Sequence, residues 1–303
     1  MMYIPPYLQP GDTIAMVLPA GYMPAEKTRT CIETLHTWGY KVHIGATLDG
    51  HSDNYFSGSD EARLADLQQA LDNPAVKAIL CARGGYGLSR IIDRIDFSSF
   101  KKDPKWIIGF SDITVLHAHI YTNYRTATLH APMAGAFNDG GAEGEYVGSL
   151  RHALEGKKTI YSCPAHPFNR QGQAEGPLVG GNLSLLAHLC GTSSEIKTKG
   201  RILFLEDVGE YLYNVDRMLY QLKRNGRLDR LAGLIVGGFT DMKDTTRPFG
   251  QSVYEIIRDI VNEYDYPVCF GFPVSHGGDN YALKHGMPHS LTVTADKTIL
   301  EEG

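Results

Sequence analysis

The sequence lacks the features that mark membrane proteins and nucleic-acid-binding proteins. No segment approaches the roughly 18 consecutive apolar residues of a membrane-spanning helix. The start of the chain, Met1 to Asp12, has neither the basic residues nor the apolar run of a signal peptide. Lysine and arginine total 29 against 34 aspartate and glutamate, so the formal net charge is −5, and no basic block occurs. We therefore expect neither a membrane nor a nucleic acid as a partner.

Cysteine is also scarce, and its spacing excludes several kinds of site. The five cysteines form no C-x-x-C pattern of the kind that binds zinc or works as a redox pair. The sequence contains no H-E-x-x-H metal motif and no Gly-Lys-Ser/Thr phosphate loop, and the run from Gly85 to Arg90 lacks the third glycine of a dinucleotide-binding fingerprint. We expect no metal and no cofactor, and widely spaced thiols fit a reducing cytoplasm.

What the sequence does have is an alternation of apolar strand-like segments and helix-like segments over 303 residues. This length exceeds that of most single domains, and the alternation predicts an α/β fold with parallel sheets covered by helices. After about residue 154 the periodicity weakens, and glycine, proline and lysine accumulate. We therefore predict a Rossmann-like or flavodoxin-like domain over 1–160, a linker over 161–175 and a second α/β domain over 176–303.

The predicted elements follow one another in a strand-then-helix order. Strands are expected at Asp12 to Pro19, Lys41 to Ile44, Val76 to Cys81, Trp106 to Gly109, Arg201 to Leu205, Leu231 to Phe239 and Pro267 to Phe272. Helices are expected at Ala25 to Trp38, Ser59 to Asp72, Leu88 to Ile95, Leu183 to Cys190, Val215 to Arg224 and Ser252 to Tyr264. In a parallel sheet, functional groups gather beyond the carboxyl ends of the strands.

One of these strand ends carries a serine that could act as a nucleophile. The segment from Trp106 to Leu116 predicts a buried strand that ends at Gly109 and turns at once into a helix beginning at Ser111. Backbone N–H groups at a helix start can stabilise the oxyanion that forms when a serine hydroxyl attacks a carbonyl. Taken alone, however, Ser111 followed by Asp112 is more typical of ordinary helix capping.

A carboxylate and a histidine at later strand ends complete the set that an activated serine needs. Glu206 and His276 are each expected just after a strand, and parallel neighbouring strands would bring both to one edge. The histidine would take the serine proton and the carboxylate would fix the tautomer of the imidazole. The alternatives are a polar loop histidine and an exposed strand-end carboxylate. His117, His119 and His130 are rival bases, although His117 lies too far along its helix to reach back comfortably.

Six short motifs in register resemble a known family of serine peptidases. They are Ala82-Arg83-Gly84-Gly85-Tyr86-Gly87, Gly109-Phe110-Ser111-Asp112, His130-Ala131-Pro132-Met133, Gly180-Gly181-Asn182, Phe204-Leu205-Glu206-Asp207 and Phe272-Pro273-Val274-Ser275-His276-Gly277. Together they closely resemble the LD-carboxypeptidase family over nearly the whole chain. The resemblance implies a cytoplasmic, usually homodimeric hydrolase in which two α/β domains bring a serine and a glutamate–histidine pair together across the inter-domain cleft. Matched by motif, the catalytic residues are Ser111, Glu206 and His276.

The residues around the predicted nucleophile suggest how the substrate is held. The backbone N–H of Asp112 and one from Gly84 or Gly85 are expected to bind the oxyanion, because glycine lets the main chain approach closely. Arg83 is a candidate for binding the free terminal carboxylate of a substrate. The alternative is a surface arginine or one in a dimer interface.

Two departures from the family pattern bear on how the substrate fits. Ala131 and Ser275 stand where the family more often has glycine. The substrate that the resemblance implies is the murein tetrapeptide released during peptidoglycan recycling, whose terminal D-Ala is removed from diaminopimelate or lysine. A peptidase acting on microcin C-type peptidyl nucleotides and a non-catalytic peptide-binding protein are the alternatives.

Overall fold

The computed structural model describes residues 2–49, 52 and 54–303, and the contacts within the chain divide it into two units. Unit 1 comprises Met1–Lys157 together with Tyr281–Lys284, and unit 2 comprises Lys158–Asn280 together with His285–Gly303. The chain therefore leaves unit 1 after Lys157 and later contributes one further short segment to it.

Unit 1 is built on a six-stranded sheet with the order β11-β5-β4-β3-β1-β2. Its strands are β1 (Thr13–Val17), β2 (Lys41–Ile44), β3 (Val76–Cys81), β4 (Trp106–Gly109), β5 (Thr128–His130) and β11 (Leu283–His285). Strands β1 to β5 pair in parallel. The order β2-β1-β3-β4-β5 is that of flavodoxin-like folds, one of the two fold types expected from the sequence. All side chains of β4 are buried, which explains its unbroken apolar sequence.

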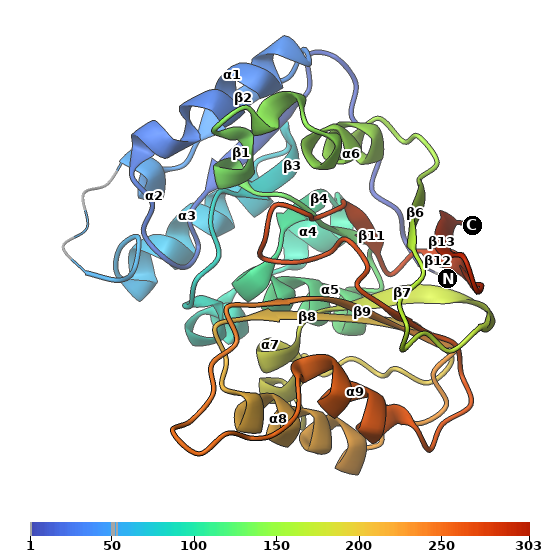
Figure 1. Ribbon diagram of the computed structural model, residues 1–303. Coiled ribbons are helices and arrows are strands. Elements are labelled where there is room, and N and C mark those ends of the chain that lie inside the picture. Colours follow the sequence, from blue (N-terminus) through green and yellow to red (C-terminus); the bar gives the residue numbers. More distant parts are fainter. Residues whose placement is uncertain (1, 50–51, 53) are drawn as a thin grey trace. The chain divides into compact units, whose positions relative to one another are not determined.

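Helices cover both faces of this sheet. They are α1 (Arg29–Thr37), α2 (Ala46–Asp49), α3 (Asp60–Asp72), α4 (Ser98–Lys102), α5 (Thr114–Tyr124) and α6 (Glu145–Leu154). Figure 1 shows α1 and α6 on one face of the sheet and α3, α4 and α5 on the other. Short 3₁₀-helices connect them: η1 (Ala25–Thr28), η2 (Leu88–Arg90), η3 (Ile92–Arg94), η4 (Ser111–Ile113), η5 (Ala134–Phe137) and η6 (Gly141–Glu143).

One predicted helix of unit 1 is wrong. Instead of a helix from Leu88 to Ile95, the structure has the two short turns η2 and η3. The carbonyl of Gly87 accepts the backbone N–H of Arg90, an i→i+3 bond typical of a 3₁₀ turn, and also a guanidinium N–H of Arg63. A distant side chain therefore takes part in the geometry of this turn.

Unit 2 is built on a seven-stranded sheet with the order β10-β9-β8-β7-β12-β13-β6. Its strands are β6 (Ile160–Pro164), β7 (Gly172–Asn182), β8 (Ile202–Val208), β9 (Gly233–Thr240), β10 (Val268–Phe270), β12 (Pro288–Val293) and β13 (Lys297–Glu302). Strands β7 to β10 are parallel, whereas β12, β13 and β6 join by antiparallel pairing. The helices α7 (Leu183–His188), α8 (Leu212–Arg224) and α9 (Val253–Val261) lie on one face of this sheet (Figure 1).

The range predicted to be a linker contains strand residues in the structure. Residues 161–164 belong to β6 and 172–175 to β7. The side chains of β6 alternate between exposed and buried, and β6 is the edge strand of its sheet, where a residue such as Pro164 is tolerated. The composition of β6, which resembles that of a turn, therefore reflects the position of this strand at the edge of the sheet.

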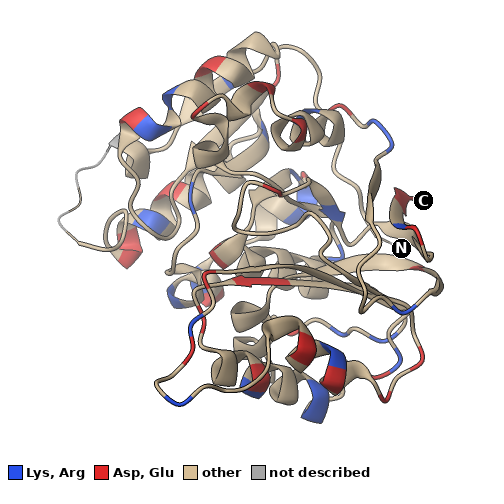
Figure 2. Cartoon of the chain, in the orientation of Figure 1, with Lys and Arg blue, Asp and Glu red and all other residues tan. Residues whose placement is uncertain are grey.

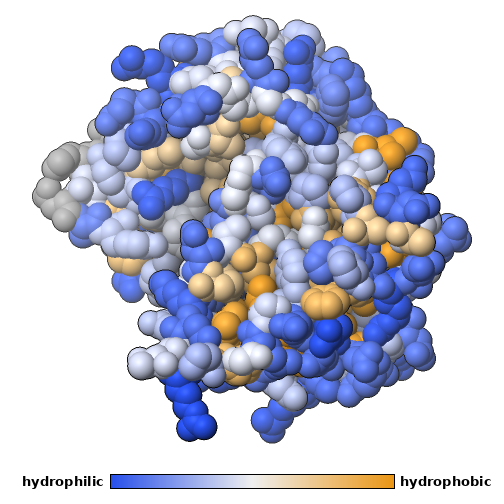
Figure 3. All heavy atoms as spheres, in the orientation of Figure 1, coloured by the Kyte–Doolittle hydropathy of each residue, from blue (hydrophilic) through white to orange (hydrophobic). Residues whose placement is uncertain are grey.

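Charged residues of both signs are mixed in the orientation that Figures 2 and 3 show. Figure 2 shows acidic and basic residues interspersed on the helices of each unit. On the face drawn in Figure 3, hydrophilic residues predominate and hydrophobic ones form small separate groups. Within the described part of the chain, no helix combines the length and the apolar character needed to cross a bilayer.

Candidate active site

Ser111 lies at a sharp turn between β4 and α5. Its φ of +64° is in the left-handed region, and it is the first residue of η4, which leads into α5. The helical segment begins at Ser111 as predicted, but the alternative interpretation of Ser111 as an ordinary helix cap is wrong, because Phe110, with an extended backbone, occupies the cap position. A left-handed non-glycine residue costs about 1–3 kcal/mol and persists where the surroundings enforce it. In α/β-hydrolases, a strained strand-to-helix turn presents the serine nucleophile.

Gly84, in the loop after β3, packs directly against this turn. A Cβ atom at Gly84 would lie 2.8 Å from Cβ of Ser111, 3.0 Å from its Oγ and 3.2 Å from the backbone N of Asp112. Only glycine fits at this distance. The loop is also tied to the segment after β1, because Gly21 N–H donates to the carbonyl of Gly84 at 3.0 Å. The structure thus brings Gly84, Ser111 and the N–H of Asp112 together.

The side chain of Asp112 joins the loops that follow β3 and β4. It is fully buried, and its Oδ2 accepts the backbone N–H of Leu88 at 2.9 Å. Burial raises the pKa of Asp112 to about 6, while the N–H groups of Leu88 and Gly87 and the charge of Arg63 act in the opposite direction. The sequence predicts a role only for the backbone N–H of Asp112; the role of its carboxylate depends on the contact with Leu88 in another loop.

The remaining predicted residues of unit 1 have separate environments. The side chain of Arg83 is exposed and donates a hydrogen bond to the carbonyl of Tyr22. Of the rival histidines, His117 is buried with its Nε2 2.8 Å from the carbonyl oxygen of Gly109, and burial lowers the pKa of His117 to about 4. His119 stacks on Phe97 with 5.2 Å between ring centroids. These contacts give both histidines structural roles.

Glu206 and His276 meet within unit 2. Strand β8 is longer than predicted and includes Glu206, which is fully buried rather than exposed at a strand end. His276 follows β10, and its Nδ1 lies 2.6 Å from Oε2 of Glu206. Burial disfavours the charged imidazole, but the hydrogen bond and the charge of Glu206 outweigh burial and raise the pKa of His276. The pair is arranged as a base and its orienting carboxylate.

The loop that carries His276 is closed by Ser275. The hydroxyl of Ser275 donates to the carbonyl of Asp279 at 3.0 Å and accepts the N–H of Gly277 at 2.9 Å. A Cβ atom at Gly238, on β9, would lie 2.5 Å from Cβ of Ser275, so glycine is needed there. The sequence marks Ser275 only as a departure from the family pattern, whereas its hydroxyl holds the histidine loop.

A second buried carboxylate organises the start of α7. Asp207 accepts hydrogen bonds from Asn182 Nδ2 at 2.8 Å and from the N–H and the hydroxyl of Ser184 at 2.9 and 2.6 Å.

Across residues 2–49, 52 and 54–303, no three His, Cys, Asp or Glu side chains group as ligands for a metal ion.

Comparison with known proteins identifies the family. A model described as the LD-carboxypeptidase N-terminal domain matches residues 14–131, and one described as the LD-carboxypeptidase C-terminal domain matches residues 175–291. The chain belongs to the LD-carboxypeptidase family. As a member of this family the protein is a carboxypeptidase, and the matched ranges place Ser111 in its N-terminal domain and both Glu206 and His276 in its C-terminal domain.

Relatives are similar to this LD-carboxypeptidase over nearly their full length. A protein of Bacillus subtilis named probable murein peptide carboxypeptidase is 36% identical, covering 99% of this chain and 95% of the relative. The crystal structure of muramoyltetrapeptide carboxypeptidase from Oxalobacter formigenes has a TM-score of 0.87 and 30% identity, covering 96% of this chain and 98% of its own. The microcin C7 self-immunity protein of Escherichia coli is 26% identical, and the match covers 91% of this chain and 89% of the relative.

Proposed function

We propose that the protein is a serine LD-carboxypeptidase that hydrolyses the amide bond between an L-centre, diaminopimelate or lysine, and the terminal D-Ala of murein tetrapeptides. The observation that carries the proposal is the 2.6 Å contact between His276 Nδ1 and Glu206 Oε2. This contact orients the imidazole with Nε2 as the nitrogen that exchanges protons with a serine. The names of the relatives in B. subtilis and O. formigenes support the substrate class.

In the proposed mechanism Ser111 is the nucleophile. Its Oγ forms a bond to the amide carbonyl carbon while its proton passes to His276 Nε2. The N–H of Asp112 and one from Gly84 or Gly85 bind the oxyanion. The C–N bond then breaks as His276 returns the proton to the amine of the leaving D-Ala. Water, activated by the same imidazole, hydrolyses the acyl-enzyme and restores the serine.

Assigning the three residues to one site is part of this proposal. The six motifs occur in the order that the family resemblance requires, and the connectivity of the chain supports the assignment. The chain returns to unit 1 at Tyr281, five residues after His276.

We further propose that the protein works as a homodimer in the cytoplasm. Sedimentation of the purified protein as a monomer would contradict the dimer.

The proposed substrate is tested by the product released. The enzyme should liberate D-Ala from a murein tetrapeptide ending in L-Lys-D-Ala or diaminopimelate-D-Ala, detected by chromatography of the free amino acid. The similarity to a microcin C7 self-immunity protein makes a peptidyl nucleotide the competing substrate. Release of an aminoacyl nucleotide at the higher kcat/KM would favour that alternative. Binding of the peptide without any turnover would favour a peptide-binding protein.

Arg83 is proposed to bind the terminal carboxylate of the substrate. Arg83 is exposed, and it directly precedes Gly84, which packs on Ser111. A hydrogen bond to a charged group contributes about 1.5–3 kcal/mol. Amidation of the substrate's terminus should therefore lower kcat/KM roughly tenfold to a hundredfold, and Arg83→Met should lower activity on the acid but not on the amide. Equal rates on acid and amide would show that the carboxylate is not recognised.

A further inference from the structure

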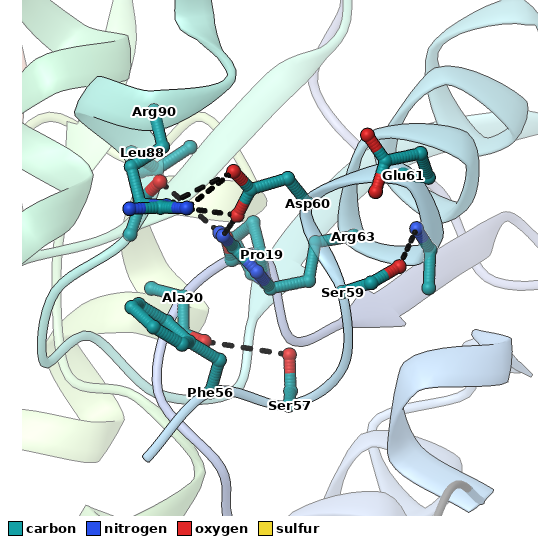
Figure 4. Close-up of polar contacts among 12 residues, drawn as sticks. Pro19, Ala20, Phe56, Ser57, Ser59, Asp60, Glu61, Arg63, Leu88 and Arg90 are labelled. Atoms are coloured by element: carbon teal, nitrogen blue, oxygen red, sulfur yellow. Dashed lines mark hydrogen bonds and ion pairs between the residues drawn. The ribbon is translucent and has the colours of Figure 1, made fainter. Parts of the chain in front are cut away.

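The guanidinium of Arg63, on α3, is completely buried in unit 1 and is held by several partners. Its Nη1 donates to the carbonyl of Pro19 at 2.6 Å and to that of Gly87 at 3.1 Å. Its Nη2 forms an ion pair with Asp60, and the group lies 4.9 Å from the centroid of the Phe56 ring. Figure 4 shows Asp60 between the guanidinium groups of Arg63 and Arg90. A cation buried to this extent needs such partners.

These contacts connect loops at the carboxyl edge of the sheet. Pro19 follows β1, and Gly87 lies in the loop after β3 that also contains Gly84 and Gly85. Gly87 has a φ of +154°, and a Cβ atom there would lie 2.6 Å from Nη1 of Arg63. Glycine at 87 therefore allows the guanidinium to reach the main chain.

One peptide group in this loop is held from both sides. Arg63 binds the carbonyl of Gly87, and Asp112 accepts the N–H of Leu88 at 2.9 Å. That carbonyl and that N–H belong to the same peptide unit. The buried cation on α3 and the buried carboxylate next to Ser111 are thus linked through a single rigid plane.

We propose that Arg63 is a positioning residue for the nucleophile: through the Gly87–Leu88 peptide it fixes Asp112, and with it the oxyanion-binding N–H and the left-handed backbone of Ser111. The inference rests on the proposed function of Ser111. Arg63 makes no contact with the substrate in this scheme; it holds the groups that do.

Because Arg63 is charged, its proposed role should be visible in how the reactivity of Ser111 depends on pH. Burial raises the pKa of Asp112 to about 6, and Arg63 is the cation that opposes this rise. Among the described residues, the thiol of Cys81 at the end of β3 also interacts electrostatically with Asp112, and burial keeps this thiol neutral by raising its pKa. Without Arg63 the pKa of Asp112 rises further. Near neutral pH its carboxyl group then becomes protonated and binds the Leu88 N–H more weakly.

The experiment measures how fast a fluorophosphonate probe modifies Ser111 as a function of pH, with the modified peptide identified by mass spectrometry. Arg63→Met should slow labelling about tenfold to a hundredfold at neutral pH, with partial recovery at alkaline pH as Asp112 ionises. Arg63→Lys keeps the cation but not the planar fork, so it should show a smaller loss and the pH profile of the wild type.

Arg90→Met is the matched control. The side chain of Arg90 shares Asp60 with Arg63, with Nε 2.9 Å from Oδ1, and its guanidinium lies 5.4 Å from the Phe56 ring. Its side chain is half exposed. Removing this cation should leave labelling within about twofold of the wild type, as is usual for an exposed ion pair.

The outcomes separate this inference from the proposed function. If the wild type is not labelled at Ser111, the proposed nucleophile is wrong. If the wild type is labelled, the role of Arg63 is overturned by an Arg63→Met variant that reacts at the wild-type rate, or that is slowed by one constant factor at every pH. Should Arg63→Met not fold, Arg63→Lys decides: labelling several-fold slower than the wild type supports the role, and an unchanged rate overturns it.

Discussion

Replacing Ser111 with alanine is expected to lower kcat by about four to six orders of magnitude, the range seen when a serine hydrolase loses its nucleophile. Alanine removes only Oγ, so the packing of Gly84 against Cβ of residue 111 is kept. The folded state should therefore remain intact. The measurement is D-Ala release from a murein tetrapeptide under saturating conditions, combined with circular dichroism of the variant.

Ser162→Ala is the control for this change, because Ser162 is an exposed serine on β6. It should retain wild-type turnover. If Ser111→Ala still turns over at a rate comparable to the wild type, Ser111 is not the nucleophile. The reason for assigning Ser111, Glu206 and His276 to one site is then lost as well.

Replacing Glu206 with glutamine is expected to lower kcat by roughly three to four orders of magnitude, the cost of losing the orienting carboxylate in other triads. Glu206 is fully buried, and its Oε2 lies 2.6 Å from Nδ1 of His276. A neutral amide no longer stabilises the imidazolium that forms when the serine proton is transferred. It also weakens the selection of the tautomer that exposes Nε2 to the serine.

The same substitution should move the acid limb of the pH–rate profile. Glu206 raises the pKa of His276, and the base must be neutral to accept a proton, so wild-type kcat/KM increases as the pH rises through that raised value. Without the carboxylate the pKa of His276 falls. The acid limb of Glu206→Gln should then lie at lower pH, even though the maximal rate is much smaller.

Glu175→Gln serves as the comparison, since Glu175 is exposed on β7 and its loss changes the net charge equally. It should leave both the rate and the position of the limb unchanged. If Glu206→Gln lowers the rate but leaves the limb where it is, the group responsible for that limb is not His276.

The sequence predicts the parts of the site that depend on local pattern. The apolar run of β4 ending at Gly109 predicts where Ser111 lies along the chain, and the strand-then-helix pattern predicts that Glu206 and His276 lie at the ends of parallel strands. The expectation that these two strands are neighbours is wrong, because β9 lies between β8 and β10. Strand–helix alternation likewise predicts that the first sheet is parallel and covered by helices, whereas the order of its strands is known only from the structure. These features follow from hydrophobic periodicity and from short glycine-containing turns.

What the sequence does not predict depends on contacts between distant residues. The left-handed backbone of Ser111 accompanies its packing on Gly84, and Glu206 is buried because β8 continues through it between β7 and β9. Arg63 appears in the sequence as one more charge on a helix. Its burial becomes evident only when the loops after β1 and β3 surround it.

Because unit 1 includes residues from near the end of the chain, a truncated chain cannot contain unit 1 alone and complete. Strand β11, the edge neighbour of β5, follows the long segment Lys158–Asn280 of unit 2 in the sequence. A fragment ending at Lys157 would end without this strand, leaving the backbone groups of β5 uncovered along one side, a condition that promotes aggregation. A fragment that also carried residues 281–285 after a short designed turn would include the whole of β11 and could cover that side of β5.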